Sequence, residues 1–142
     1  MTRPLPDVTD PEFAPFWEGA ACGELRLVFC SQCQASRWPP RAICARCHSF
    51  AFEWRQVAAR GNLYTWTVVE HQTTPGIQAP YAVGLVEIAG HPGVRLLGQV
   101  TRDAARPLEI GMPLAARFEH VAEGVTLVNW TPEDPQTVDR KS

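Results

Sequence analysis

Four of the five cysteines in this 142-residue chain lie in two Cys-x-x-Cys pairs with ten residues between them. The pairs join Cys30 with Cys33 and Cys44 with Cys47. Each pair can form a tight turn that directs two sulfurs to one point, and two such turns complete the closed tetrahedron that structural zinc prefers. The spacing therefore predicts a zinc site with these four cysteines as ligands and no open position for catalysis.

Other uses of paired cysteines remain at this point. Iron in the same site would give a rubredoxin-like electron carrier, and a free Cys-x-x-Cys dithiol would give a redox enzyme. A thioredoxin-like enzyme is disfavoured because no βαβ pattern surrounds either pair. A disulfide framework is disfavoured because a chain of this length buries a real core without one. Cys22 has no partner at ligand spacing.

Three arginines lie within or beside the cysteine cluster, Arg37, Arg41 and Arg46. The segment 24–60 carries six arginines against two acidic residues, although the whole chain has a formal charge of −2. Four thiolates around a divalent ion carry two negative charges, which nearby arginines would offset. Alternatively, these arginines bind a phosphorylated ligand or an acidic partner surface.

The remaining sequence predicts the elements that position this cluster. Aromatic residues at helical spacing, with Asp10 as a candidate N-cap and a helix restarting at Pro15, predict an N-terminal helical segment. Five β-rich runs follow the cysteines, separated by turn signals; they span 63–70, 82–88, 94–101, 114–121 and 125–130. We therefore expect a mainly β protein with a five-stranded OB-type barrel, a small open sandwich being the alternative.

The expected organisation has four parts: an N-terminal helical arm (1–23), a zinc ribbon (24–56), a barrel (57–132) and a frayed C-terminal tail (133–142). The longest connection between strand-like runs, 71–81, is polar and contains proline and glycine. It is a candidate ligand-binding loop on a rigid barrel, and a solvated hairpin loop is the alternative. Its candidate contact residues are His71, Thr74, Gln78 and Tyr81.

Composition and motifs limit the function classes. The N-terminus has no apolar signal region and no stretch approaches the roughly 20 apolar residues of a membrane span, so we expect a cytoplasmic protein without a membrane partner. The four histidines lie in separate segments, and no nucleophile, phosphate-loop or dinucleotide motif is present. We therefore predict no catalytic residue and no independent enzyme activity.

The order of several segments resembles a known family. They are PFWEG, GELRLVFCSQC, PPRAICARCHS, FEW, RGNLYTWTVV, APYAVGLVEIAG and IGMPLAARF, which together span about residues 15 to 131. This arrangement is similar to the DUF35 family of OB-fold proteins with an N-terminal rubredoxin-like zinc ribbon. The resemblance implies a helical segment, then the ribbon, then the barrel.

The resemblance also implies a function. Members of this family are accessory subunits of thiolase-like enzymes that act on acyl-CoA thioesters, including acyltransferases and aldolases. It therefore implies a non-catalytic chain that binds such an enzyme and helps to form or stabilise its acyl-CoA site, and it makes acyl-CoA a candidate ligand of the chain.

Two alternatives to this function remain. One is a single-stranded nucleic-acid-binding module with bases stacked on aromatic residues, the candidates being Trp38, Trp54, Tyr64 and Trp66. It is disfavoured because the segment from Gly61 onward has more acidic than basic residues. The other alternative is a purely structural scaffold.

Overall fold

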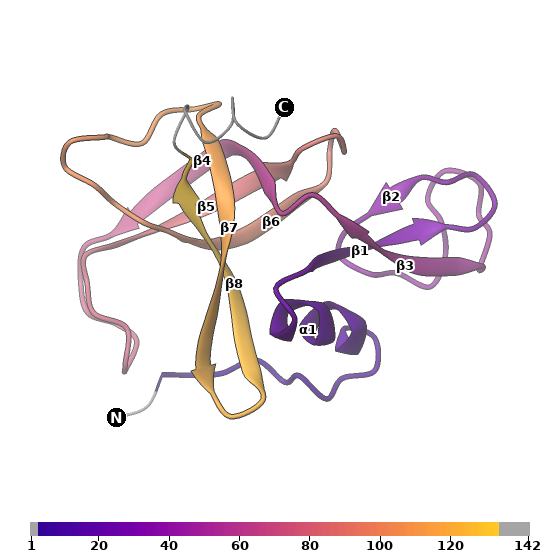
Figure 1. Cartoon of the computed structure of the whole chain (residues 1–142), viewed down its shortest axis with the longest axis horizontal. Helices are drawn as coiled ribbons and strands as arrows, with labels where there is room; N and C mark the ends of the chain where they lie inside the picture. Colours follow the sequence, from indigo (N-terminus) through magenta and orange to yellow (C-terminus); the bar gives the residue numbers. More distant parts are fainter. Residues whose placement is uncertain (1–2, 134–142) are drawn as a thin grey trace.

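A computed structural model shows one short helix and two sheets, and describes residues 3–133 (Figure 1). The elements are α1 (Ala14–Ala21), β1 (Leu25–Cys30), β2 (Ser36–Arg37), β3 (Phe52–Val57), β4 (Arg60–Val69), β5 (Tyr81–Ile88), β6 (Arg95–Val100), β7 (Pro113–Ala122) and β8 (Val125–Pro132). Within this part of the chain, no helix is long and apolar enough to cross a membrane.

The five strands that follow the cysteines form a closed barrel in the order β4-β5-β6-β8-β7, with β7 pairing back onto β4. Each overlaps one of the five predicted runs, and the mainly β fold with an OB-like barrel is confirmed. The alternation of β5 shows why these residues form a barrel wall: every second residue from Ala82 to Ile88 is buried. A strand with this period presents one face to the core and the other to the surface.

The barrel closes through a short seam between β6 and β8, which pair in parallel at Val100 and Trp130. Gly98 permits the close approach, because a Cβ there would lie 2.9 Å from the carbonyl oxygen of Val128. The buried side chain of Asn129 extends the seam, since its Oδ1 accepts the backbone N–H of Gln99 at 3.1 Å. Side-chain hydrogen bonding thus supplements a short backbone ladder.

The cysteine-bearing region forms a separate three-stranded sheet in the order β2-β1-β3, and Figure 1 shows it projecting from one side of the barrel. Only two residues separate β3 from β4. Three residues of β1, Leu25, Leu27 and Phe29, belong to the same buried cluster as Leu63 and Trp130 of the barrel. The two sheets therefore share one hydrophobic core.

The helix α1 begins at Ala14, with Pro15 in its first turn, where proline is tolerated. Asp10 organises the preceding turn instead of capping the helix: its Oδ1 accepts the N–H of Glu12 at 3.0 Å. The ring of Phe16 lies 4.6 Å from that of Trp38, which in turn lies 6.4 Å from Trp54. The N-terminal aromatic residues thus pack α1 against the ribbon.

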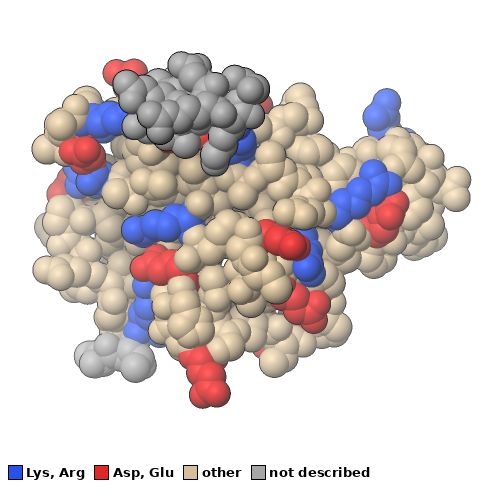
Figure 2. All heavy atoms as spheres, viewed as in Figure 1, with Lys and Arg blue, Asp and Glu red and all other residues tan. Residues whose placement is uncertain are grey.

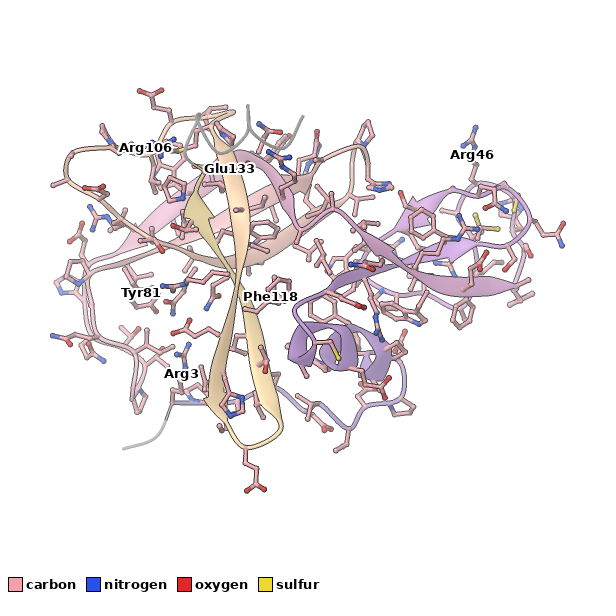
Figure 3. All side chains as sticks on the ribbon, in the orientation of Figure 1. Arg3, Arg46, Tyr81, Arg106, Phe118 and Glu133 are labelled. Carbon is pink, nitrogen blue, oxygen red and sulfur yellow. The ribbon has the colours of Figure 1, made fainter. Side chains whose placement is uncertain are left out.

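Glu133 ends the described part of the chain and is also the first residue of the predicted C-terminal tail. It is buried, its N–H donates to the carbonyl of Pro113 at 3.0 Å, and its carboxylate pairs with Arg60 at 2.6 Å. Figure 3 shows it beside Arg106, which donates to its carbonyl oxygen. The rest of the predicted tail, residues 134–142, lies outside the described residues.

Candidate metal centre

The two Cys-x-x-Cys pairs form turns with the same backbone geometry. In each turn the first cysteine's carbonyl accepts the N–H four residues later, at 3.0 Å from Gln34 and 2.9 Å from His48. The N–H of each first cysteine donates at 2.9 Å to the carbonyl five residues later. Gln34 and His48 both have a left-handed backbone, with φ of 66° and 65°. His48 thus belongs to the turn that holds Cys44 and Cys47.

The four sulfurs converge from these turns. The Sγ atoms of Cys30 and Cys47 lie 3.5 Å apart and those of Cys33 and Cys44 lie 3.7 Å apart. All four lie within 4.8 Å of one another. Tetrahedral zinc with Zn–S bonds of about 2.3 Å separates its sulfurs by about 3.8 Å. The donor set and its spacing fit a closed four-thiolate zinc site.

Backbone hydrogen bonds favour the thiolate form at the first cysteine of each turn. The N–H groups of Cys47 and Arg46 lower the pKa of Cys44 to about 6. The N–H of Cys33, which lies 3.5 Å from Cys30 Sγ, lowers the pKa of Cys30. Each turn therefore supplies one buried sulfur that is prepared to bind a cation.

The second cysteine of the second turn behaves differently. The N–H of Ser49 lowers the pKa of Cys47, but the neighbouring thiol of Cys30 and desolvation outweigh it, and the pKa rises to about 11. Without a cation, the clustered sulfurs therefore do not all ionise at neutral pH. A divalent ion removes this conflict, because it favours the thiolate form of every ligand.

The three predicted arginines lie together beside this centre. Arg37, Arg41 and Arg46 line a cleft of about 240 Å³, together with Cys44 and the turn Pro92–Val94 between β5 and β6. Arg37 is held in place because its Nη2 donates to the carbonyl oxygen of Arg41 at 2.6 Å. Its Nε and Nη1 are buried and have no hydrogen-bond partner among residues 3–133. The cleft therefore gathers the positive charge of three arginines, of which Arg41 and Arg46 are exposed.

The predicted loop residues lie elsewhere. Figure 3 shows Arg46 at one end of the molecule and Tyr81 toward the other. His71 and Gln78 are exposed in the connection before β5, and Thr74 is half-buried there. The loop is organised by Gln72, whose Oε1 accepts the N–H of Ala79 at 2.8 Å and whose Nε2 donates to Thr74 at 2.9 Å. The structure does not bring these residues to the arginine cleft.

The surface charge is mixed. On the face shown in Figure 2, the blue and red side chains of the described residues are interspersed rather than gathered in a continuous basic stripe. Among the candidates for stacking bases, Trp38 and Trp54 pack in the aromatic cluster with α1, Trp66 is half-buried and Tyr64 is exposed. These features do not resemble a groove that follows a phosphate backbone.

Sequence reasoning did not identify three features. The left-handed positions had a usable signal, since Gln34 and His48 each directly follow a Cys-x-x-Cys pair. No sequence signal marked Gln72, because its partners depend on the loop conformation. No sequence signal marked the pocket beside Trp66 either, because its walls are distant in sequence.

Comparisons with known proteins agree with this architecture. Residues 17–53 match the family described as the ChsH2 rubredoxin-like zinc ribbon domain, and residues 54–119 match the ChsH2 C-terminal OB-fold domain. The chain thus has a rubredoxin-like zinc ribbon with four cysteines positioned to bind the metal.

Two curated relatives are similar over much of the chain. A probable enoyl-CoA hydratase alpha subunit from Thermomonospora curvata is 33% identical over 94% of this chain, which spans only 41% of that relative. A DUF35 domain-containing scaffold protein from Methanocaldococcus jannaschii is 31% identical over 68% of each chain.

A solved structure supports the same assignment. It is described as the Ltp2-ChsH2(DUF35) aldolase, and it superposes with a TM-score of 0.80 at 29% identity, covering 89% of this chain and 98% of the other. The ribbon, the barrel and these relatives agree, and the chain therefore belongs to the DUF35 family. It has a ChsH2-type zinc ribbon followed by an OB-fold domain.

Proposed function

We propose that this chain is a non-catalytic accessory subunit that binds a thiolase-like enzyme and helps to form or stabilise its acyl-CoA site. The observation that carries the proposal is the match over nearly the whole chain to the ChsH2(DUF35) protein solved with Ltp2 as an aldolase. The relatives named as a hydratase alpha subunit and as a scaffold protein also support a role beside an acyl-CoA enzyme.

The chemistry of the described residues supports a role without catalysis. Four of the five cysteines form the metal centre, and Cys22 is exposed at the end of α1. His48 lies in a metal-binding turn, and the ring of His91 packs against Phe29 at 5.4 Å. A nucleophile needs a base within hydrogen-bond reach, and no such pair occurs among the side-chain hydrogen bonds of residues 3–133 outside the metal centre.

Within this proposal, the arginine cleft is the part that contacts the phosphate groups of acyl-CoA. Arg37 is fixed by its bond to the carbonyl of Arg41 and contributes its positive charge to the cleft, while Arg41 and Arg46 are exposed at the rim. Guanidinium groups bind phosphate through paired, charge-assisted hydrogen bonds. The loop residues His71, Thr74, Gln78 and Tyr81 form a second, separate polar surface, which we assign to the partner enzyme.

The test is copurification of this chain with a thiolase-like enzyme encoded beside it, followed by assay of acyl-CoA turnover. Arg41→Glu should raise the KM for acyl-CoA about tenfold, which corresponds to about 1.4 kcal/mol, and should leave zinc content and copurification unchanged. The backbone carbonyl that holds Arg37 remains in this variant. Arg117→Glu, which changes an exposed arginine on β7, is the matched control and should leave the KM unchanged.

Two results would contradict the proposal at different levels. If Arg41→Glu and Arg117→Glu have the same KM as the wild type, the arginine cleft does not bind the phosphates. If the enzyme is stable and fully active alone, and this chain neither binds it nor changes its turnover, the accessory role itself is wrong.

A further inference from the structure

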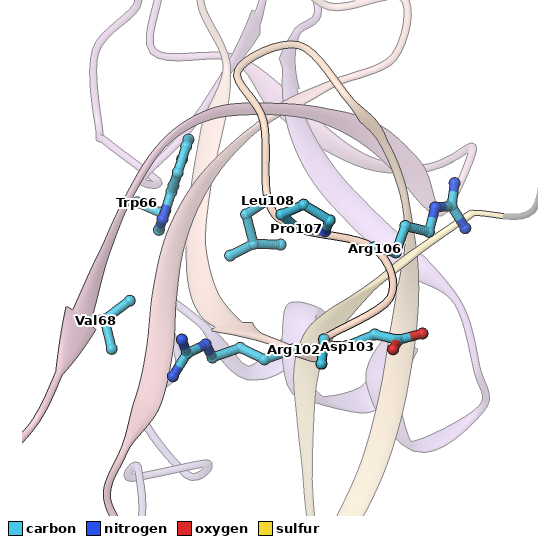
Figure 4. A pocket seen from close by; sticks show the side chains of 8 residues that line it. Trp66, Val68, Arg102, Asp103, Arg106, Pro107 and Leu108 are labelled. Atoms are coloured by element: carbon cyan, nitrogen blue, oxygen red, sulfur yellow. The ribbon is translucent and has the colours of Figure 1, made fainter.

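The barrel carries a pocket that is separate from the metal centre and its arginines. Its volume is about 510 Å³, within the range of small-molecule sites. It lies between β4 and the connection from β6 to β7, as Figure 4 shows. Its lining residues are Trp66, Val68, Arg102, Asp103, Ala104, Arg106, Pro107 and Leu108.

The apolar lining residues of the pocket come from both of its walls. Trp66, Val68 and Leu108 are half-buried, and each packs against the hydrophobic core of the barrel while it also lines the pocket. Because the core holds these side chains in place, a ligand would meet apolar walls at little entropic cost. The space between the Trp66 ring and Leu108 favours a ligand with a planar or ring-shaped apolar body.

The charged residues that line the pocket differ in whether they are hydrogen-bonded to other residues of the chain. The Oδ1 of Asp103 accepts the N–H of Ala105 at 2.9 Å, and Arg106 donates to the carbonyl of Glu133. Arg102 is exposed and has no ion pair or hydrogen bond with any residue from 3 to 133. Figure 4 agrees: Arg102 extends below the space between Trp66 and Leu108, whereas Asp103 and Arg106 extend to the far side. The charge that faces the space between Trp66 and Leu108 is therefore that of Arg102.

We infer that this pocket is a binding site for a small organic anion with a flat apolar body, such as an aromatic carboxylate. The apolar body lies against Trp66, Val68 and Leu108, and the anionic group pairs with Arg102. The site does not depend on the accessory role proposed above, because it is complete within this chain and lies on the barrel rather than on the ribbon.

The inference is tested with 2-naphthoate and its neutral counterpart 2-naphthamide, titrated into the zinc-loaded full chain and followed by NMR. The indole N–H signal of Trp66, identified by its absence in Trp66→Phe, should shift saturably with naphthoate. Arg102→Gln should weaken naphthoate binding at least fivefold, as expected for loss of a charge-assisted hydrogen bond of about 1 kcal/mol or more, and should leave naphthamide binding unchanged.

The matched control is Arg117→Gln, which removes the same charge from β7 outside the pocket and should leave both affinities unchanged. Trp66→Leu removes the indole ring and should weaken both ligands to a similar degree, followed by the NMR signals of the ligands because the Trp66 signal is lost. The inference is overturned if the Trp66 signal does not shift saturably in the wild type, or if Arg102→Gln and Arg117→Gln bind naphthoate equally well.

Discussion

The zinc ribbon and the barrel adjoin each other, with two residues between β3 and β4, yet different interactions hold them together. The barrel encloses fully buried side chains such as Leu63, Leu114 and Trp130. The ribbon beyond β1 has few buried side chains and leaves Ile43, Phe50 and Phe52 exposed. Its folding therefore depends on four sulfurs that converge on a metal, whereas that of the barrel depends on burial of apolar surface.

The strongest challenge to this comparison is removal of one metal ligand. Cys44→Ser should lose zinc, because it removes one of the four thiolate ligands. The ribbon should then unfold, because a structural zinc site supplies about 10 kcal/mol or more of folding free energy. Hydrogen exchange should then become fast in residues 30–52 while β4 to β8 remain protected. Elemental analysis and hydrogen-exchange mass spectrometry measure these two outcomes.

The matched control for this experiment is Cys22→Ser, because Cys22 is exposed and outside the sulfur cluster. It should retain about one zinc per chain and wild-type exchange. Slow exchange in residues 30–52 of metal-free Cys44→Ser would show that the ribbon folds without the metal.

A change in the barrel should have a smaller effect that spreads over the whole chain. Leu63→Ala should lower the free energy of unfolding by about 2–5 kcal/mol, because it leaves a cavity in the shared core. Zinc content under native conditions should stay the same. Denaturant unfolding followed by circular dichroism, together with metal analysis, tests both statements.

Leu97→Ala is the control for this core substitution, because Leu97 is 70% exposed on β6. Its effect should stay within about 0.5 kcal/mol. Equal losses for Leu63→Ala and Leu97→Ala would mean that burial in the barrel does not determine the stability of the chain.

The smallest predicted effect is a gain in the ribbon. His48 has a left-handed backbone, which is unfavourable for a residue with a Cβ. His48→Gly should therefore stabilise the zinc-bound ribbon by about 0.5–1 kcal/mol. Zinc transfer to a chelator should become about two to five times slower.

His48→Ala separates backbone strain from loss of the imidazole, because alanine keeps the Cβ. It should transfer zinc no more slowly than the wild type. If alanine and glycine slow the transfer equally, the left-handed backbone of this turn is not what limits stability.

The sequence was sufficient for the features that depend on local spacing. Two Cys-x-x-Cys pairs predicted the metal centre, and β-rich runs separated by turn signals predicted the five barrel strands, since both signals extend over a few neighbouring residues. The family resemblance was likewise confirmed. The helix start differed by one residue from the predicted restart at Pro15.

The features that sequence analysis missed depend on contacts between distant segments. Trp66 meets the 102–108 connection only after the barrel closes, and Arg60 pairs with Glu133 across most of the barrel sequence. Composition also could not show that the ribbon arginines and the 71–81 loop lie apart. Such placement follows from tertiary packing, which propensity and periodicity do not encode.

The matching geometry of the two cysteine turns has a consequence for the order of folding. Each turn closes within six residues, and joining the turns closes a loop of only ten residues, so the entropic cost of assembling the metal centre is small. Barrel closure instead requires Asn62 to pair with Pro113, far along the chain. Because folding rates fall as contacts become more distant in sequence, we expect the metal centre to form within a chain whose barrel is still open.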